Sequence, residues 1–256
     1  MVRARIAPAV LIAMIPALTA GPAIGDYWQP EDGHKMHFPQ EGDLDTGVAV
    51  YDMAPTRLAD DWQCSESGAV TDIHIWVSWK NDQDTSIGGA DIAIRSDSGT
   101  EPGGELWSRS FDGENIGYWV WSSSPDGLWW YDPTTGNAEE DDHTALVMLS
   151  FSIGAQDAFT QTEGARYWLD VSLELDEQAA EQLGWSNTND SYRNGAVWWD
   201  DQDSTWRRLS YPSGHPEAQN EDDQMDLAFV IVPEPATIAL LALGAGATVL
   251  RRRRRG

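Results

Sequence analysis

Residues Ala69–Lys80 read A-V-T-D-I-H-I-W-V-S-W-K, and their side chains alternate in character along the chain. Successive side chains of a β-strand point to opposite faces. One face of this stretch is apolar and carries Ile73, Ile75, Val77 and Trp79. The other face carries Asp72, His74, Trp76 and Ser78. A period of two over this length predicts a β-strand.

Strand patterns of the same kind recur on both sides of this stretch. They fall at Gly47–Tyr51, Leu58–Cys64, Ala90–Ser96, Glu105–Phe111, Ile116–Ser122, Leu128–Tyr131, Thr144–Ile153, Ala165–Leu175, Gly195–Trp199, Thr205–Tyr211 and Met225–Val232. Clusters typical of turns separate them, for example Ser124–Gly127 and Pro133–Gly136. Only Asp176–Leu183 has a helical pattern, and it is short. The sequence therefore predicts an all-β body, a single jelly-roll-like β-sandwich over residues 46–232.

Both ends of this body have distinct signals. Asp26–Asp45 is rich in Pro, Gly and acidic residues, and we expect it to form a loose lead-in segment before the sandwich. Met225–Val232 runs directly into Pro233, which cannot donate a hydrogen bond to a β-ladder, so the last strand should stop there. The single cysteine, Cys64, ends an apolar-patterned strand and is expected to be buried, with no partner for an internal disulfide.

Residues 233–256 consist of three parts. Pro233, Glu234 and Pro235 come first, and an uncharged segment over residues 236–250 follows. Its large apolar side chains are Ile238, Leu240, Leu241, Leu243, Val249 and Leu250. As a helix this segment rises about 22 Å, and flanking arginines that snorkel make such a short transmembrane span tolerable. The basic residues Arg251, Arg252, Arg253, Arg254 and Arg255 should stay on the cytoplasmic side by the positive-inside rule.

This order of parts resembles the PEP-CTERM sorting signal, in which Pro-Glu-Pro precedes a short transmembrane helix and a basic cluster. Pro233, Glu234 and Pro235 carry the motif in this chain. The resemblance implies recognition by an exosortase, a membrane cysteine protease-transpeptidase, and release or transfer of the body at the cell envelope. The alternative is a plain tail anchor that is never cut.

The first 25 residues have the features of a secretory signal peptide. Arg3 and Arg5 form a positive n-region, Ile6–Leu18 is apolar, and Ala23 and Gly25 are small residues before a cleavage site. We expect residues 1–25 to direct export through the Sec machinery. The alternative is an uncleaved anchor.

The charge of the body excludes some partners. Of the 16 basic residues, seven lie in the two terminal segments, whereas of the 42 acidic residues only Glu234 does. Residues 26–232 therefore carry nine basic and 41 acidic residues, a net charge of −32. Such a field repels nucleic acid and anionic lipid, so membrane contact is expected only through the C-terminal helix.

The chain contains 14 tryptophans, and three pairs are candidates for sugar stacking. These are Trp119 with Trp121, Trp129 with Trp130, and Trp198 with Trp199. Rings that are exposed and coplanar would stack on a sugar such as exopolysaccharide. The alternative is that these rings fill the core and cover loops, because an indole buries a large apolar area.

Four acidic clusters fall in predicted loops, at 81–84, 139–142, 200–203 and 221–223. Calcium takes six to eight oxygen ligands, usually from loop carboxylates and carbonyls. Asp200, Asp201 and Asp203 follow a predicted strand and form the best structural calcium candidate; no other cofactor is expected. The alternative is a solvated loop.

Several pieces of the body resemble an uncharacterised family of secreted bacterial β-domains. The matching pieces include L-A-D-D-W-Q-C at Leu58–Cys64, Val70–Asp82 and L-S-Y-P-S-G-H-P at Leu209–Pro216. The resemblance implies no activity and no binding residues. We expect no enzyme, because the sequence contains no G-x-S-x-G, H-E-x-x-H or P-loop motif.

Three functions remain open from the sequence. The first is a non-catalytic, exported surface or extracellular-matrix protein, and it is the one that we expect. The second is a carbohydrate-binding module for exopolysaccharide. The third is a glycoside-active enzyme, which would use a pair of carboxylates. Among 41 acidic residues some pair is almost certain to be close, so finding one is no evidence for this function.

Overall fold

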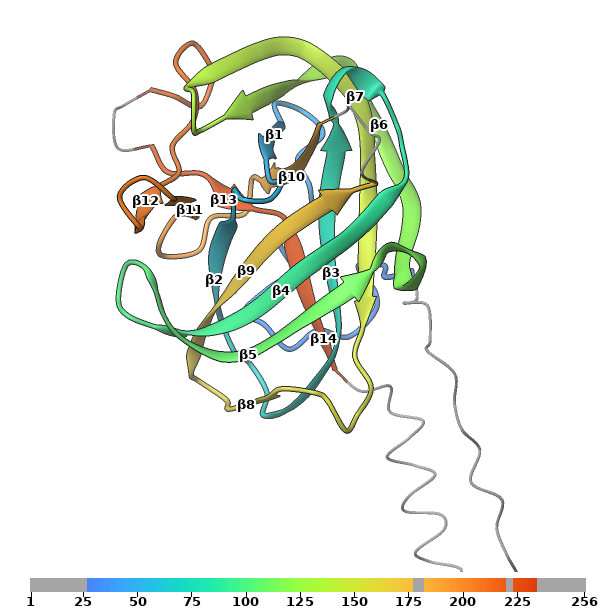
Figure 1. The fold of residues 1–256 in the computed structure, drawn as a ribbon, viewed down its shortest axis with the longest axis vertical. Helices are drawn as coiled ribbons and strands as arrows, with labels where there is room; N and C mark the ends of the chain where they lie inside the picture. The colour runs from blue at the N-terminus through green and yellow to red at the C-terminus, as the bar shows by residue number, and fades with distance from the viewer. Residues whose placement is uncertain (1–26, 177–181, 220–222, 234–256) are drawn as a thin grey trace, which may run out of the picture.

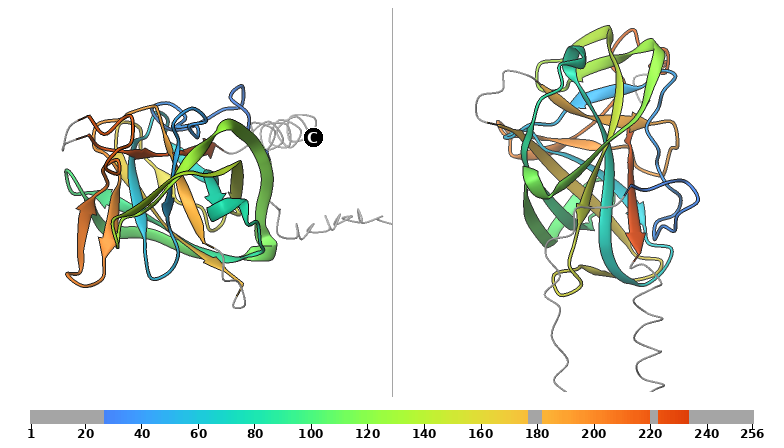
Figure 2. Two further views of the ribbon diagram at one scale, coloured as in Figure 1. Left: turned by 90° about the horizontal axis from the view of Figure 1, so that it is seen from above. Right: turned by 90° about the vertical axis from the view of Figure 1, so that its right-hand side faces the viewer.

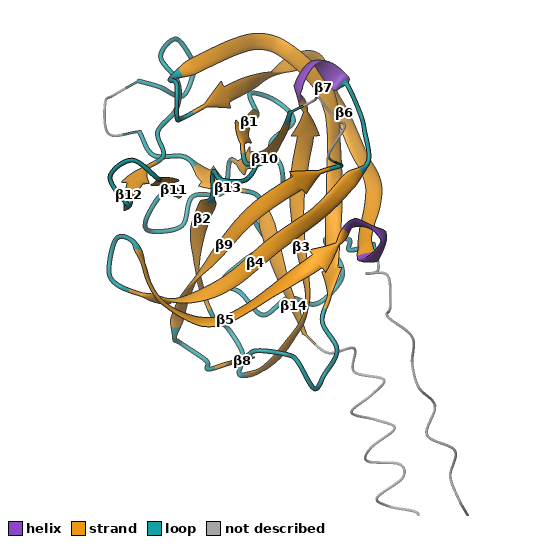
Figure 3. Cartoon of the chain, in the orientation of Figure 1, coloured by secondary structure: helices purple, strands orange, loops and turns teal. Residues whose placement is uncertain are grey.

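The computed structural model describes residues 27–176, 182–219 and 223–233. Within these ranges the chain forms two β-sheets packed face to face (Figures 1 and 2), with two short helical turns at Lys80–Asp82 and Gly113–Asn115 (Figure 3). The predicted all-β body of two sheets is confirmed, whereas its jelly-roll connectivity stays a prediction. The predicted signal peptide, the helix at 236–250 and most of the short helix at 176–183 lie outside the described residues. No helix inside those ranges has the length and hydropathy needed to span a bilayer.

The larger sheet has eight strands. Its order is β13 (Asp226–Leu227), β10 (Leu183–Thr188), β1 (Val48–Tyr51), β6 (Ile116–Asp132), β7 (Asn137–Ser152), β3 (Gly68–Trp79) and β14 (Phe229–Pro233), and β8 (Thr160–Gln161) pairs with β3. The pairing of β1 with β6 is parallel, and the other pairings in this sheet are antiparallel.

The smaller sheet has six strands, all paired antiparallel. Its order is β12 (Thr205–Arg208), β11 (Val197–Asp200), β2 (Leu58–Gln63), β9 (Arg166–Leu175), β4 (Ile87–Asp97) and β5 (Pro102–Asp112). β9, β4 and β5, the last of which is an edge strand, lie nearest the viewer in Figure 1.

The strand β3 lies inside the larger sheet and is buried on both faces. Ile73 is in register with Phe151 of β7, and the Phe151 ring meets Phe111 of β5 with 5.2 Å between ring centroids. The apolar face predicted for this strand therefore points at the smaller sheet. The opposite face carries Trp76, which is also fully buried.

The lead-in segment provides this second covering, so the expectation of a loose segment is wrong for residues 27–45. Trp28 is 2% exposed and packs edge-on against Trp76, with 5.9 Å between centroids. The backbone N–H of Gln40 donates to Phe229 O at 3.1 Å along β14. Gly42 passes so close to β3 and β7 that a Cβ there would lie 2.5 Å from Leu146 Cδ2. The segment lacks long regular strands, yet it is a packed part of the body.

Other differences from the sequence prediction are local. The predicted turn at Ser124–Gly127 is wrong, because β6 continues through it with register shifts against β7, a series of bulges. The strand β10, which follows residues 177–181, was missed because the alternation in L-G-W-S-N-T includes only Leu183 and Trp185 before three polar residues. Cys64 is buried with a free thiol, as expected, and β14 ends at Pro233.

The packing of the lead-in segment predicts a large stability effect at Trp28. The change Trp28→Ala should lower the free energy of unfolding by about 3–5 kcal/mol, because it removes a buried indole and leaves a cavity against Trp76. Urea denaturation followed by circular dichroism measures the loss. The control is Val120→Ala, at a side chain that is 66% exposed, which should change stability by no more than about 0.5 kcal/mol. Equal effects of the two changes would contradict the structural role of the segment.

Candidate functional site

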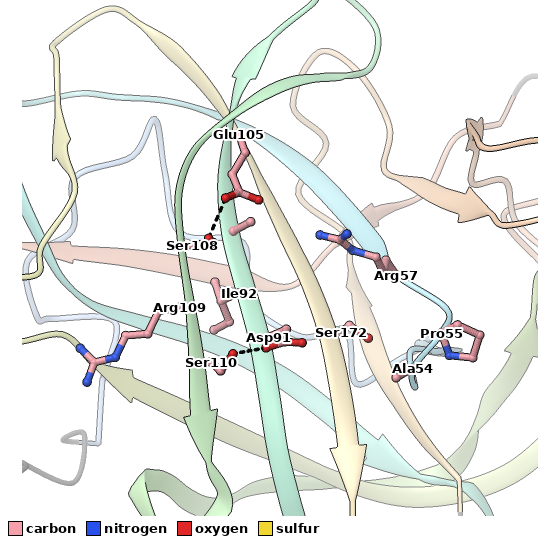
Figure 4. A pocket seen from close by; sticks show the side chains of 11 residues that line it. Ala54, Pro55, Arg57, Asp91, Ile92, Glu105, Ser108, Arg109, Ser110 and Ser172 are labelled. Atoms are coloured by element: carbon pink, nitrogen blue, oxygen red, sulfur yellow. Dashed lines mark hydrogen bonds between the residues drawn. The ribbon is translucent and has the colours of Figure 1, made fainter.

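A groove on the outer face of the smaller sheet is the best-formed candidate site, with a volume of about 500 Å³. Asp91 of β4 lies in register with Ser110 of β5 and with Ser172 of β9, so these three side chains share the outer face. The loop before β2 closes one side of the groove with Pro55 and Arg57 (Figure 4). The full lining is Ala54, Pro55, Arg57, Asp91, Ile92, Ala93, Glu105, Ser108, Arg109, Ser110 and Ser172.

Hydrogen bonds fix the polar side chains of the groove. Ser110 Oγ donates to Asp91 Oδ1, and Ser108 Oγ donates to Glu105 Oε1 at 2.7 Å. Figure 4 shows both pairs along the same strand edge. An ionised carboxylate accepts several hydrogen bonds, so both acids keep acceptor capacity for a ligand.

A buried ion cluster lies beside the groove and holds Arg57 in place. The Asp170 side chain has no exposed surface and accepts hydrogen bonds from Arg57 Nε at 3.0 Å and from Arg95 Nε at 2.5 Å. A buried carboxylate is stable only with such partners. Arg57 and Arg95 share the single carboxylate of Asp170, which holds Arg57 beside the groove, and Asp91 and Glu105 are the exposed acids of the lining.

The second arginine of the lining contributes less to the groove. Arg109 lies over the Phe111 ring at 4.9 Å and stands 3.8 Å from Asp157, and Figure 4 shows it pointing away from Asp91 and Glu105. None of the eleven lining residues is His or Cys, so no Ser–His or Cys–His pair lines the groove. The arrangement offers fixed hydrogen-bond acceptors and donors, which suits binding of a hydroxylated ligand.

The structure places all 14 tryptophans in described ranges, and none of them is exposed. Trp119 and Trp121 are half-buried under Tyr27, whose ring lies 6.1 Å and 5.6 Å from theirs. Trp121 also stacks on Trp28 at 6.4 Å. The lead-in segment thus covers the strand face of Trp119 and Trp121, which the sequence analysis named as a candidate for sugar stacking.

The two tryptophan doublets are also used in packing. Trp130 is buried, and half-buried Trp129 meets His215 with 5.1 Å between centroids. Trp198 packs against the main core, and Trp199 lies 5.3 Å from Trp206 across the β11–β12 hairpin. Sugar stacking by these residues stays a prediction, and the described residues contain no flat, exposed indole platform for it.

The carboxylates of the predicted calcium cluster are not gathered around one point. Arg207 donates to Asp200 Oδ2 at 2.5 Å and also to Asp203, while the backbone N–H of Gln202 donates to Asp200 Oδ1 at 2.9 Å. These contacts form the turn of the β11–β12 hairpin, and Asp201 is exposed within it. No three His, Cys, Asp or Glu side chains of the described ranges are placed to share a metal ion.

Sequence reasoning missed a group of buried carboxyl groups near β2 and β13. Asp60 is fully buried and accepts hydrogen bonds from Leu227 N at 2.7 Å and from Gln40 Nε2 at 3.1 Å. Asp61, on the other face of β2, accepts a hydrogen bond from Asn194 Nδ2 at 3.0 Å. The signal was available in L-A-D-D-W-Q, because two adjacent acids in a strand point to opposite faces, so one of the two faces the core of a sandwich.

The predicted sorting residues lie mainly outside the described residues. Glu234, Pro235, the span at 236–250 and Arg251–Arg255 are not described, and Pro233 is the last residue of β14. The described chain therefore ends where the motif begins.

These observations define a class of protein: a two-sheet, all-β body that is followed directly by a sorting signal. Residues 36–232 match the family model described as a domain of unknown function, DUF7901, so the chain belongs to this family. Residues 232–255 match the PEP-CTERM protein-sorting motif. This motif implies an exported protein that an exosortase processes and that is sorted to the cell envelope or surface. No curated protein matches the chain.

The buried carboxyls predict that stability falls as pH rises. Burial raises the pKa of Asp61 to about 7, with contributions from Asp226 and Asp97, and burial raises the pKa of Asp226 to about 6. Both values exceed the ordinary value of 3.8, so between about pH 4 and 7 the folded state binds more protons than the unfolded state. Each extra proton bound by the folded state changes the free energy of unfolding by at most about 1.4 kcal/mol per pH unit. The free energy of unfolding therefore falls as pH rises through this range.

Urea denaturation at pH 5, 6, 7 and 8 measures this slope. The change Asp61→Asn should flatten it, because the amide does not titrate. The control Asp201→Asn also removes one carboxylate from the acidic body but at an exposed position. An unchanged slope in Asp61→Asn would show that general charge repulsion, rather than the buried group, sets the pH dependence.

Proposed function

We propose that this chain is a non-catalytic surface or extracellular-matrix protein that an exosortase delivers to the cell envelope. One observation carries the proposal: the sorting match begins at residue 232, inside β14 (Phe229–Pro233), with no linker between them. A cut on the C-terminal side of Pro233 leaves all the described strands in the released body. The body is therefore complete as a folded unit without its tail.

The surface chemistry supports binding rather than catalysis. The groove has fixed hydrogen-bonding groups without a histidine or cysteine in its lining. The net charge of −32 over residues 26–232 keeps such a body soluble in an extracellular matrix. Exosortase and the export machinery are the partners that the two terminal segments support.

Replacing Glu234 tests the sorting step. In the native host Glu234→Ala should leave full-length protein in the membrane fraction, because the motif that the exosortase reads is lost. Mass spectrometry of the C-terminus and immunoblots of membrane and surface fractions measure the outcome. The control is Glu101→Ala, which removes an exposed carboxylate from the loop between β4 and β5. A shortened C-terminus at wild-type levels in Glu234→Ala would contradict exosortase processing at this motif.

A second candidate function is carbohydrate binding, which one observation favours. The groove brings Asp91, Glu105, Ser108 and Ser110 together on one face beside Arg57, and these groups match the hydroxyls of a neutral sugar. If the groove is the carbohydrate site, hydrogen bonds rather than ring stacking hold the sugar, because the tryptophan rings are covered. Anionic polysaccharides are disfavoured by the charge of the body.

A pull-down on exopolysaccharide from the native host tests this candidate. Asp91→Asn with Glu105→Gln should lower the bound fraction at least tenfold, because two charged acceptors become neutral amides. The charge-matched control is Glu101→Gln with Asp126→Asn, two exposed acids outside the groove lining. If both double variants bind as the wild type does, the groove is not the sugar site.

A further inference from the structure

A second cavity, of about 380 Å³, lies between the end of β10, the segment before β11 and the loop that leads to β13. We call it the Asp226 cavity. Its lining is Thr188, Asn189, Ser191, Arg193, Gly195, Tyr211, Glu217, Gln219, Asp223, Gln224 and Asp226. Every lining residue except Gly195 carries a polar side chain, and none of them is His, Cys or Met. The cavity therefore offers hard oxygen donors and no soft ligand.

The carboxylate of Asp226 is left incompletely paired in this cavity. Asp226 is 4% exposed, and its Oδ2 accepts a hydrogen bond from Tyr192 N at 3.1 Å. The Ser191 side chain also hydrogen-bonds to this carboxyl group. Its Oδ1 is buried without a hydrogen-bond partner in the described ranges. A buried carboxylate oxygen in this position costs free energy unless a proton or a cation satisfies it.

The charges around Asp226 favour a cation. Glu217 and Asp223 line the same cavity, and Arg193 is the one basic residue of the lining. The fully buried carboxyl group of Asp60 lies on the interior side and accepts a hydrogen bond from Leu227 N. The pKa of the Tyr211 hydroxyl is raised to about 12 by burial and by the charges of Asp43, Glu217 and Asp226, against the hydrogen bond from Asn187. The cavity is therefore a negative site inside an already acidic body.

We propose that the Asp226 cavity binds a calcium ion, with Asp226 Oδ1 as the buried ligand and loop side chains as the remaining oxygen donors. Calcium accepts carboxylate, amide and hydroxyl oxygens together with water in a flexible shell of six to eight ligands. Asn189, Gln219 and Glu217 supply donors of these kinds at the rim.

The expected affinity is in the millimolar range. No three carboxylates of the described chain converge on one point, so the shell needs neutral oxygens and water. Calcium sites of extracellular modules with few charged ligands bind in the range of roughly 10⁻⁴–10⁻³ M. This site differs from the hairpin cluster at Asp200, whose carboxylates bond to Arg207.

Thermal unfolding of the full chain in detergent at pH 7.5 tests the proposal. Calcium from about 0.1 to 10 mM should raise Tm by mass action and the rise should continue above the dissociation constant. Magnesium should do much less, because it sheds water reluctantly and needs tighter octahedral geometry. Asp226→Asn keeps the side-chain size and should weaken calcium binding at least tenfold. Glu217→Gln, at an exposed rim position, should weaken it less and leaves the buried groups in place.

Two controls separate the site from general screening. Asp201→Asn removes one exposed carboxylate at the hairpin and should keep the full calcium response. Terbium, a calcium mimic, should show luminescence sensitised by nearby Tyr211 in the wild type and lose it on addition of calcium, and this measurement needs no variant. A calcium response of equal size in Asp226→Asn and in the wild type overturns the proposal, as does the absence of both the Tm shift and the terbium signal.

Discussion

The fold depends on burial of β3 along both of its faces. A strand that is apolar on one side needs one covering layer, but Trp76 places a large indole on the other side as well. The smaller sheet covers the first face through contacts such as Phe111 with Phe151. The lead-in segment covers the second with Trp28, Gln40 and Gly42. Burial of an indole is worth several kcal/mol, so residues before the first strand are part of the stable unit.

The strands of the sheets were largely predictable from local pattern, because alternation is a local property. β3, β4, β5, β7 and β9 all lie where apolar and polar residues alternate. β10 was not predictable in this way: it is buried on both sides, but its only large apolar side chains are Leu183 and Trp185, and polar residues follow them. The lead-in segment was misread for a related reason. Pro, Gly and acidic residues indicate that regular strands are absent, but they say nothing about packing, which here rests on a few anchors such as Trp28 and Met36.

The groove and the fate of the tryptophans depend on information that a single sequence lacks. Asp91, Ser108 and Ser110 fall in predicted strands, but only the register of β4 with β5 brings them together. Likewise Trp119 and Trp121 share a face as predicted, yet whether that face is open is decided by Tyr27 and Trp28, about 90 residues earlier in the chain. Arg207, on the other strand of the same hairpin, forms ion pairs with Asp200 and Asp203. The register of β4 with β5 and the packing of the lead-in segment are non-local contacts, which local patterns in a single sequence do not show.

The acidic residues of this chain belong to two physically different groups. Exposed carboxylates are screened over a Debye length of about 8 Å at physiological salt, so many of them together mainly increase solubility. Asp60, Asp61 and Asp226 are buried, and burial raises the pKa of each of them above its ordinary range. Of these three, Asp60 is satisfied by Gln40 and by a backbone N–H, which ties the lead-in segment to β2 and β13. Asp226 has one satisfied oxygen and one that is not. A protein sorted to the cell envelope or surface meets variable pH and divalent ions. We expect these variables to act on the stability of this fold through the buried carboxyl groups rather than through the acidic surface.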